Sequence, residues 1–272
     1  MSRSKPLENY LNILYYCESM DLIAIIGILI GLGAVVAGNI AEGGTTAHLI
    51  QLAAAIIVFG GTIGAVLLSF TPKDLIYAFL CLKFAFLKRK VNIDETVETI
   101  LDLLVIARRK GILALQEEIP KIQDPLLRRG INYIIDGISP AIIKEALYQE
   151  VYAYEDILRR AAKVYDSAGG YAPTIGIIGA ILGLIHVLKN VAEPSKIGIG
   201  IATAFVATIY GVGSANLIFI PIAKRIINKM EEEILLMELI IEGVLGIEAG
   251  VNPYFLRAKL EAFIKDRQRE RI

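Results

Sequence analysis

Hydrophobic residues gather along the chain in four long runs, and the charged residues fall between them. The runs are Leu22–Ile40, Leu49–Phe70, Pro173–Leu188 and Ile197–Ile222. A helix that crosses a membrane needs about 20 mainly apolar residues, with a range of roughly 17–25. Four runs of nearly this length, arranged in two pairs, predict four membrane-spanning helices and not the buried core helices of a soluble protein.

The charged residues are segregated from these runs. Between residues 22 and 70 the only charged residue is Glu42, and between residues 172 and 223 there are only Lys189, Glu193 and Lys196. The segment between the two uncharged blocks, residues 71–171, holds 15 basic and 14 acidic residues. The pattern therefore predicts two membrane-embedded pairs of helices that flank a large polar domain.

Lysine and arginine in the short flanks predict the orientation of the spans. Five basic residues follow the second run closely, namely Lys73, Lys83, Lys88, Arg89 and Lys90, and Lys224, Arg225 and Lys229 follow the fourth. The connector at residues 41–46 has no lysine or arginine, and the connector between the third and fourth runs has two lysines. Because cytoplasmic loops are enriched in these residues, we expect both termini and the middle domain to lie in the cytoplasm.

The chain is therefore predicted to be an all-α integral membrane protein with a helical cytoplasmic domain and a helical cytoplasmic tail. We divide it into an N-terminal extension (1–19), the first two spans (20–70), the cytoplasmic domain (71–172), the last two spans (173–222) and the tail (223–272). For the extension, an alternative start at Met20 and a small interfacial helix are both open interpretations.

Apolar spacing in the cytoplasmic domain predicts three helices. The first covers Asp94–Arg109, with Asn92 as its N-cap. The second is short, Ile112–Ile119, and ends at Pro120, and the third covers Ala141–Asp166. Gly169 and Gly170 then separate this helix from the third span.

Small residues and prolines mark the spans. Glycine pairs four residues apart occur in the first three, as Gly27/Gly31, Gly60/Gly64 and Gly179/Gly183, a spacing that lets helix backbones approach closely in lipid. Pro173 is expected in the first turn of the third span, where proline is well tolerated. Pro221 is expected inside a continuous helix, which it should kink because it removes one backbone hydrogen bond.

No Asp, Glu, Lys or Arg lies in the middle of any span. The polar groups at depth are hydroxyls, on Thr62, Thr203, Thr208, Tyr210 and Ser214, with Thr174 near an edge. Intramembrane ionisable residues mark ion paths and proton relays. If the protein conducts ions, a carboxylate must therefore come from a partner.

The remaining composition excludes several classes of function. The net charge is zero, with 28 basic and 28 acidic residues, which argues against a nucleic-acid-binding protein. Two cysteines and two histidines without metal-ligand spacing argue against a metal site, and there is no phosphate-binding loop. We expect no catalytic site, no metal and no cofactor.

Three segments resemble the flagellar stator A subunit, the MotA/PomA family within the MotA/TolQ/ExbB superfamily. Tyr171–Ile185 (YAPTIGIIGAILGLI) is similar to the family's third span, Ala204–Gly211 (AFVATIYG) with Asn216 and Pro221 is similar to its fourth, and Ala107–Leu115 (ARRKGILAL) is similar to its charged cytoplasmic segment. The resemblance covers residues 20 to about 263.

The resemblance implies a subunit of the bacterial flagellar motor in the inner (cytoplasmic) membrane. In that family a ring of A subunits, taken as five, surrounds two MotB-like subunits, which supply the intramembrane aspartate and anchor the complex to peptidoglycan. Ion flow, of protons or sodium, is converted into torque on the rotor protein FliG.

The resemblance also implies roles for single residues. Arg108, next to Arg109, matches the arginine that meets FliG, whereas the acidic position of that contact is Gln116 here, with Glu117 beside it. Pro173 and Pro221 match the prolines that couple ion flow to conformational change. Thr208 matches a hydroxyl that faces the ion path, with Thr174 as a second candidate. Ala180 stands where sodium-driven members carry threonine, which favours protons.

Three alternatives have other expected patterns. An ExbB/TolQ-type energiser typically has three spans, with its large cytoplasmic block after the first. A secondary transporter would have polar residues near the midplane and broken spans in both halves. A membrane scaffold without ion flow is opposed only by the resemblance itself.

Overall fold

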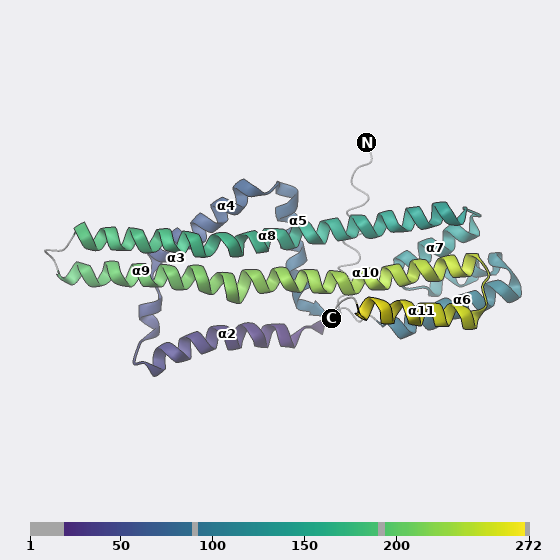
Figure 1. Cartoon of the computed structure of the whole chain (residues 1–272), viewed down its shortest axis with the longest axis horizontal. Helices are drawn as coiled ribbons and strands as arrows, with labels where there is room; N and C mark the ends of the chain where they lie inside the picture. Colours follow the sequence, from purple (N-terminus) through teal and green to yellow (C-terminus); the bar gives the residue numbers. More distant parts are fainter. Residues whose placement is uncertain (1–18, 89–91, 190–193, 270–272) are drawn as a thin grey trace. The chain divides into compact units, whose positions relative to one another are not determined.

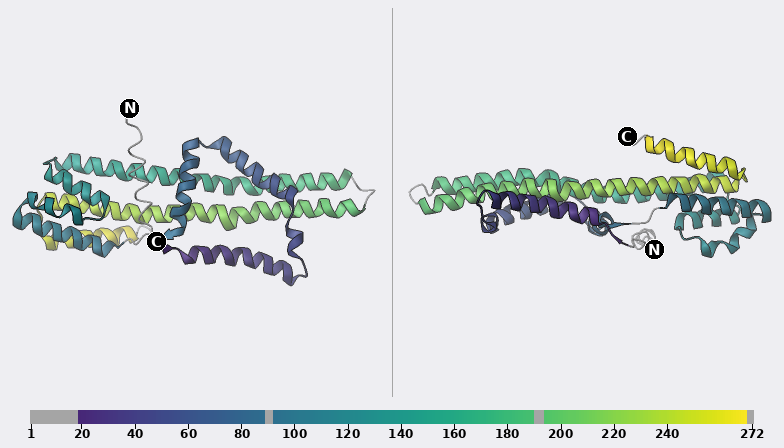
Figure 2. Two further views of the ribbon diagram at one scale, coloured as in Figure 1. Left: turned by 180° about the vertical axis from the view of Figure 1, so that it is seen from behind. Right: turned by 90° about the horizontal axis from the view of Figure 1, so that it is seen from below.

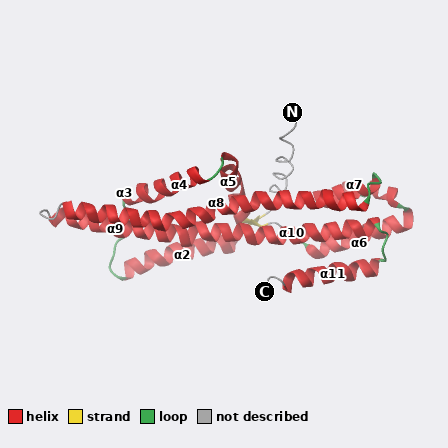
Figure 3. Cartoon of the chain, turned by 45° about the horizontal axis from the view of Figure 1, so that its top comes forward, coloured by secondary structure: helices red, strands yellow, loops and turns green. Residues whose placement is uncertain are grey.

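The computed structural model describes residues 19–88, 92–189 and 194–269, and nearly all of them are helical (Figures 1 and 3). The α-helices are α2 (Leu22–Ala41), α3 (Leu52–Ala55), α4 (Gly61–Ser69), α5 (Pro72–Phe86), α6 (Ile93–Lys110), α7 (Pro125–Ile135), α8 (Pro140–Lys189), α9 (Pro194–Ser214), α10 (Ile220–Glu248) and α11 (Pro253–Arg269). Residues 1–18 of the expected extension and 190–193 of the third connector lie outside the described residues.

Four helical segments are long and apolar enough to cross a membrane, which confirms the predicted number of spans. They are Leu22–Ala41, Leu52–Ser69, the helix Pro140–Lys189 and the run Ile197–Glu248. The second span begins at Leu52, slightly later than expected, because Thr46–Leu49 forms a 3₁₀ turn (η1) and Gln51 is extended.

Two spans contain a π-helical turn, which their sequences did not indicate. One, η2 (Ile56–Gly60), joins α3 to α4, and the other, η5 (Ala215–Phe219), joins α9 to α10. A π turn inserts one extra residue into an α-helix and is frequent at functional sites. Pro221 is the second residue after η5, so the π turn lies just before the proline.

The chain forms two compact units. The first comprises residues 1–89 and 157–228, and the second residues 90–156 and 229–272. The helix α8 and the run α9–η5–α10 contribute residues to both units. The domain boundaries drawn from the sequence stay a prediction.

The expectation that a helix starts at Pro173 is wrong. Pro173 lies inside the 50-residue helix α8, and no break separates Asp166 from the span. The glycines that suggested a break have another use, because a Cβ on Gly169 would lie only 2.6 Å from Cγ1 of Ile220. Gly169 therefore allows α8 and α10 to approach, and helix-breaking residues are tolerated inside spans where neighbouring helices support them.

Two helices that were not predicted, α5 and α7, begin at N-cap residues. Thr71 caps α5: its hydroxyl accepts a hydrogen bond from the Asp74 amide, and the Asp74 carboxylate accepts one from the Thr71 amide, with Pro72 at the first helical position. Asp124, just before Pro125, caps α7 by accepting hydrogen bonds from the Leu126 and Leu127 amides. These threonine–proline and aspartate–proline pairs were the available sequence signals.

The second unit has a conventional apolar core. The helix α6 matches the expected helix, and Asn92 caps it by accepting from the Glu95 amide. The expected short helix Ile112–Ile119 is instead two 3₁₀ turns, η3 (Ile112–Glu117) and η4 (Ile119–Lys121), because Gly111 (φ 86°) ends α6 and leaves room for only one or two turns. The fully buried side chains there include Ile100, Leu104, Leu115, Leu127, Ile131, Ile143, Leu147, Leu239, Ile240 and Ile241.

The first unit, in contrast, exposes most of its large apolar side chains. The helix α2 has no buried residue, and Ile23 (74% exposed) and Leu68 (90% exposed) illustrate the pattern on the first two spans. A small core of Ala54, Val58, Val206 and Ala207 joins the second span to the fourth. Exposed apolar side chains on helices of spanning length are those expected to face lipid or other subunits.

One pair of two-residue strands accompanies the helices. Ser19–Met20 (β1) pairs antiparallel with Leu87–Lys88 (β2), so the residues before the first span lie beside the end of α5.

Candidate functional site

The third and fourth spans approach each other backbone to backbone. A Cβ added to Gly211 would lie 2.6 Å from the carbonyl oxygen of Ala172, and one added to Gly176 would lie 2.9 Å from the carbonyl oxygen of Ala207. Real Cβ atoms essentially never come this close to backbone atoms. Only glycine therefore permits this contact between α8 and α9.

The same contact continues one and two turns further along α8. A Cβ on Gly183 would lie 2.7 Å from the Gly200 carbonyl oxygen, and one on Gly179 would lie 2.7 Å from the Ala207 Cβ. The pair Gly179/Gly183 thus packs helices as predicted. A Cβ on Gly31 would lie 3.2 Å from Leu217 Cδ2 in η5, so this member of the first predicted pair also approaches another helix, whereas a Cβ on Gly27, Gly60 or Gly64 would meet nothing within 4 Å.

The two site prolines have different surroundings. The Pro173 Cα would lie 3.2 Å from a Cβ on Gly211, so this proline belongs to the close α8–α9 contact, one turn from Thr208. Pro221 is exposed and follows the π turn η5. The structure therefore brings Pro173 and the Thr208 turn together, and leaves Pro221 at a separate point of the fourth span.

The hydroxyls of the spans donate to carbonyl oxygens of their own helices. Thr208 Oγ1 donates to Ala204 O (3.2 Å), and Thr174 Oγ1 donates to Tyr171 O (2.8 Å). The others follow the same pattern: Thr62 to Val58 O, Thr203 to Ile199 O and Ser214 to Gly211 O. Ala180, also predicted on the ion path, is half-buried.

Two hydroxyls also reach the residues at the start of the second span: Thr203 Oγ1 lies 3.5 Å from Gln51 Oε1, and the Tyr210 hydroxyl makes two hydrogen bonds there. It donates to Leu49 O (2.6 Å) and accepts from the Gln51 amide (3.3 Å), while its ring packs against Phe59 with the centroids 5.7 Å apart. Tyr210 therefore fixes the start of the second span against the fourth.

A charged cluster that the sequence analysis missed joins three helices at the other end of these spans. The Arg225 guanidinium forms an ion pair with Asp21, which immediately precedes α2, and its Nε donates to Ala85 O on α5 (2.7 Å). Asp21 is only 7% exposed. The sequence signal for this ion pair was an acidic residue directly before the first span and a basic residue just after the fourth.

The residues predicted to contact the rotor lie in the second unit and are exposed. Arg108 donates to Val251 O (3.2 Å), in the turn between α10 and α11, so it also has a structural contact. The side chains of Arg109, Gln116 and Glu117 are exposed. Gly111 lies between the basic and acidic groups, at the end of α6.

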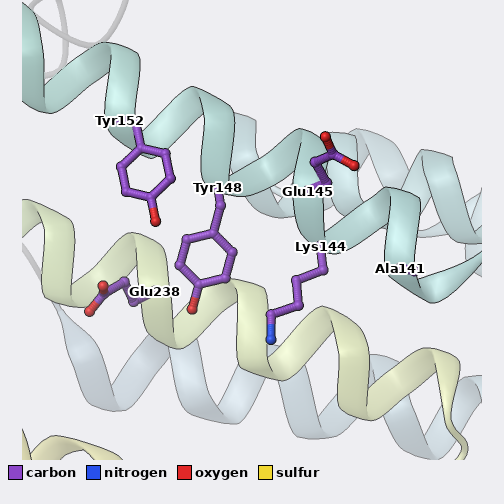
Figure 4. A pocket seen from close by; sticks show the side chains of 6 residues that line it. All are labelled: Ala141, Lys144, Glu145, Tyr148, Tyr152 and Glu238. Carbon is purple, nitrogen blue, oxygen red and sulfur yellow. The ribbon is translucent and has the colours of Figure 1, made fainter.

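A shallow groove lies between α8 and α10 in the same unit (Figure 4). Tyr148 and Tyr152 project from α8 toward α10, which contributes Glu238, and Lys144 lies 5.9 Å from the Tyr148 ring centroid. Ala141 and Glu145 complete the lining. Within the described residues, no group of three or more His, Cys, Asp or Glu side chains is placed to hold a metal ion.

Comparisons with known proteins agree with the geometry. Residues 25–111 match the profile of the motility protein A N-terminal family, and residues 118–239 match that of the MotA/TolQ/ExbB proton channel family. Motility protein A of Helicobacter pylori (strain ATCC 700392 / 26695) is 33% identical over 90% of this chain and 95% of its own length. Chemotaxis protein PomA of Vibrio alginolyticus is 29% identical over 92% of this chain and 98% of its own. The solved structure of C. jejuni MotAB contains a chain with a TM-score of 0.84 and 31% identity, covering 90% of this chain and 96% of that one.

Proposed function

Because this chain belongs to the MotA motility protein family, within the MotA/TolQ/ExbB proton channel family, we propose that it is a flagellar stator subunit that forms an ion channel with a MotB-like partner. It is a multi-pass membrane protein with four spans and a channel subunit, not an enzyme. The proposed complex converts ion flow across the bacterial inner membrane into torque on FliG.

The observation that carries this proposal is the glycine-lined contact of the third and fourth spans beside Pro173. Two backbones that touch without intervening side chains can slide or rotate against each other with few rotamers to rearrange. Pro173 leaves one carbonyl of α8 without its helical amide partner, which weakens the helix at the same level. We place the conformational change there, with Pro221 as a second adjustable point.

The partner supplies the group that titrates. The spans carry hydroxyls and no acidic residue at mid-depth, and a threonine hydroxyl does not ionise near neutral pH. A MotB-like aspartate, alternately charged and neutral, would lie against the Thr208 face of the fourth span, with Thr174 and Ala180 on the third.

The conformational change of the spans would reach the rotor through residues of the cytoplasmic domain. Both termini and residues 71–172 are assigned to the cytoplasm, on the lysine and arginine counts of the flanks. Arg108 and Arg109 are the basic part of the proposed rotor contact, and either Gln116 or Glu117 takes the place of its acidic part. A homo-oligomeric ring, taken as five subunits, would present several copies of this contact to the rotor.

Protons are the favoured coupling ion. The family is a proton channel family, and Ala180 lacks the hydroxyl that a sodium ion would coordinate in place of water. PomA is also a relative, so sodium is the alternative that an experiment has to separate.

The test is swimming in a host that lacks its own stator genes. The full chain is co-expressed with a candidate B subunit, and swimming speed is measured while sodium is varied at fixed pH. We expect motility only when both chains are present, and a speed independent of sodium. The matched control replaces the B subunit's intramembrane aspartate by asparagine, which should abolish swimming without reducing the amount of complex in the membrane.

Two results would decide against the proposal. An inserted, assembled complex that conducts ions without producing rotation would favour an ExbB/TolQ-type energiser. Ion conduction by this chain alone would refute the argument that a partner supplies the carboxylate.

A further inference from the structure

The helix α5 is attached to membrane-spanning helices at both of its ends. It begins at Pro72, directly after the second span ends at Ser69. At its other end the Asp21 amide donates to Phe86 O (2.8 Å), and β2 pairs with β1, so the helix ends beside the start of the first span at Leu22. Two consecutive spans form a hairpin, and Leu22 and Ser69 therefore lie at the same face of the membrane.

This attachment fixes the direction of α5. A helix of 15 residues is about 22 Å long, because each residue adds about 1.5 Å. A straight segment of that length with both ends at one membrane face must run along the face. Figure 2 agrees, since α5 crosses the direction of α2 and α9.

One side of α5 is held by the rest of the first unit. The Tyr165 hydroxyl donates to Ala78 O (2.9 Å), and Arg225 donates to Ala85 O (2.7 Å). Asp74, the only acidic residue of α5, is 8% exposed and accepts a hydrogen bond from the Thr71 hydroxyl (2.6 Å). Cys81 is buried on the same side, where burial raises the pKa of its thiol to about 12.

The opposite side of α5 is apolar in the middle and basic at its ends. Phe79 is 74% exposed and Ile76 is 56% exposed. Lys73 and Lys83 are exposed and follow the same helical stripe, three residues before Ile76 and four after Phe79. No acidic residue of α5 lies on this side.

We propose that α5 is an interfacial helix that binds anionic phospholipid headgroups of the leaflet at which it lies. The Ile76 and Phe79 side chains enter the boundary between headgroups and acyl chains, and the Lys73 and Lys83 ammonium groups meet lipid phosphates. An amphipathic helix with basic residues beside an apolar face binds a membrane surface in this way, and each lysine near an anionic surface favours binding by about fivefold. This inference rests on the spans and not on the motor function, so either can fail alone.

The chain contains no tryptophan, so one substitution supplies a unique fluorophore. The full-length Phe79→Trp variant is reconstituted in phosphatidylcholine vesicles that contain either dibrominated phosphatidylglycerol or dibrominated phosphatidylcholine. Leu68→Trp, at a 90% exposed position of the second span, is the lipid-facing control, and Tyr254→Trp, at an 84% exposed position of α11, is the water-facing control.

We expect the Phe79→Trp emission to be blue-shifted from that of Tyr254→Trp and to be quenched more strongly by brominated phosphatidylglycerol than by brominated phosphatidylcholine. Replacing Lys73 or Lys83 by glutamine in this background should reduce the preference for phosphatidylglycerol by about fivefold for each lysine. Unshifted emission that no brominated lipid quenches would overturn the proposal, because the face would then be in water. Blue-shifted emission without quenching would also overturn it, since protein would then cover the face. A preference that the lysine variants leave unchanged would refute the headgroup contact.

Discussion

Gly211→Ala is the substitution that tests the close contact of the third and fourth spans most directly. The new Cβ would lie 2.6 Å from Ala172 O and 3.1 Å from the Gly176 Cα, both backbone atoms that no side-chain rotation can move. An ordinary contact begins at 3.4 Å, so α8 and α9 would have to separate by about 0.8 Å at this point. Overpacking of this kind costs about 1–3 kcal/mol of folding free energy.

The matched control is Gly213→Ala, two residues further along the same helix, where an added Cβ meets nothing within 4 Å. Both substitutions gain the same helix propensity, about 1 kcal/mol for glycine to alanine. This gain cancels when the two variants are compared. We therefore expect Gly211→Ala to be less stable than Gly213→Ala by about 1–3 kcal/mol.

The assay is reversible unfolding of the full chain in mixed detergent micelles, followed by circular dichroism, with insertion into the membrane verified first. Swimming speed in the stator-deficient host gives a second measure. Equal unfolding free energies for the two variants would refute the backbone contact. A loss of swimming in Gly213→Ala alone would instead indicate that Gly213 faces a partner.

Three further predictions concern the charged groups outside the spans. Arg225→Ala should destabilise the chain by about 1–3 kcal/mol, because it leaves the buried Asp21 carboxylate without its guanidinium partner. Arg225→Lys keeps a positive charge and should be less destabilising. Thermal unfolding of both variants in detergent measures the difference. The Thr71 hydroxyl lowers the pKa of Asp74 below 3.8, so the stability difference between wild type and Asp74→Asn should be full above about pH 4 and shrink as the pH falls below it; a difference independent of pH would contradict this assignment. Arg109→Glu should impair swimming without changing the unfolding temperature, whereas Arg108→Glu should change both, because Arg108 also donates to Val251 O. Normal swimming in both variants would remove these arginines from the rotor contact.

Much of the fold followed from hydropathy and caps. The four spans need only an apolar run of sufficient length, a property of each segment by itself, and the structure confirms all four. The cap of Asn92 on α6 is equally local. The starts of α5 and α7 could also have been predicted, since Thr71–Pro72 and Asp124–Pro125 are helix starts that depend on neighbouring residues only.

The features that could not be predicted from the sequence are contacts between two helices that are distant in the chain. Gly169 has the pattern of a helix break, and only its contact with Ile220 shows that it serves packing. Gly176 and Gly211 belong to no glycine pair at a spacing of four, yet their contact is the tightest of the candidate site, because what matters is the register between helices. Asp21 and Arg225 are 204 residues apart in the chain, and the only sequence signal for their ion pair is that they flank the first and fourth spans.

The hydrogen bonds of the span hydroxyls have a consequence for charge selectivity. A hydroxyl that donates its only proton to a carbonyl of its own helix, as Thr208 and Ser214 do, has only oxygen lone pairs to offer to anything beside it. The hydroxyls of the fourth span that donate in this way are therefore electron-rich acceptors, which solvate a hydrated proton or a metal cation and repel chloride. The fourth span would then disfavour anions by itself, independently of a carboxylate from the partner.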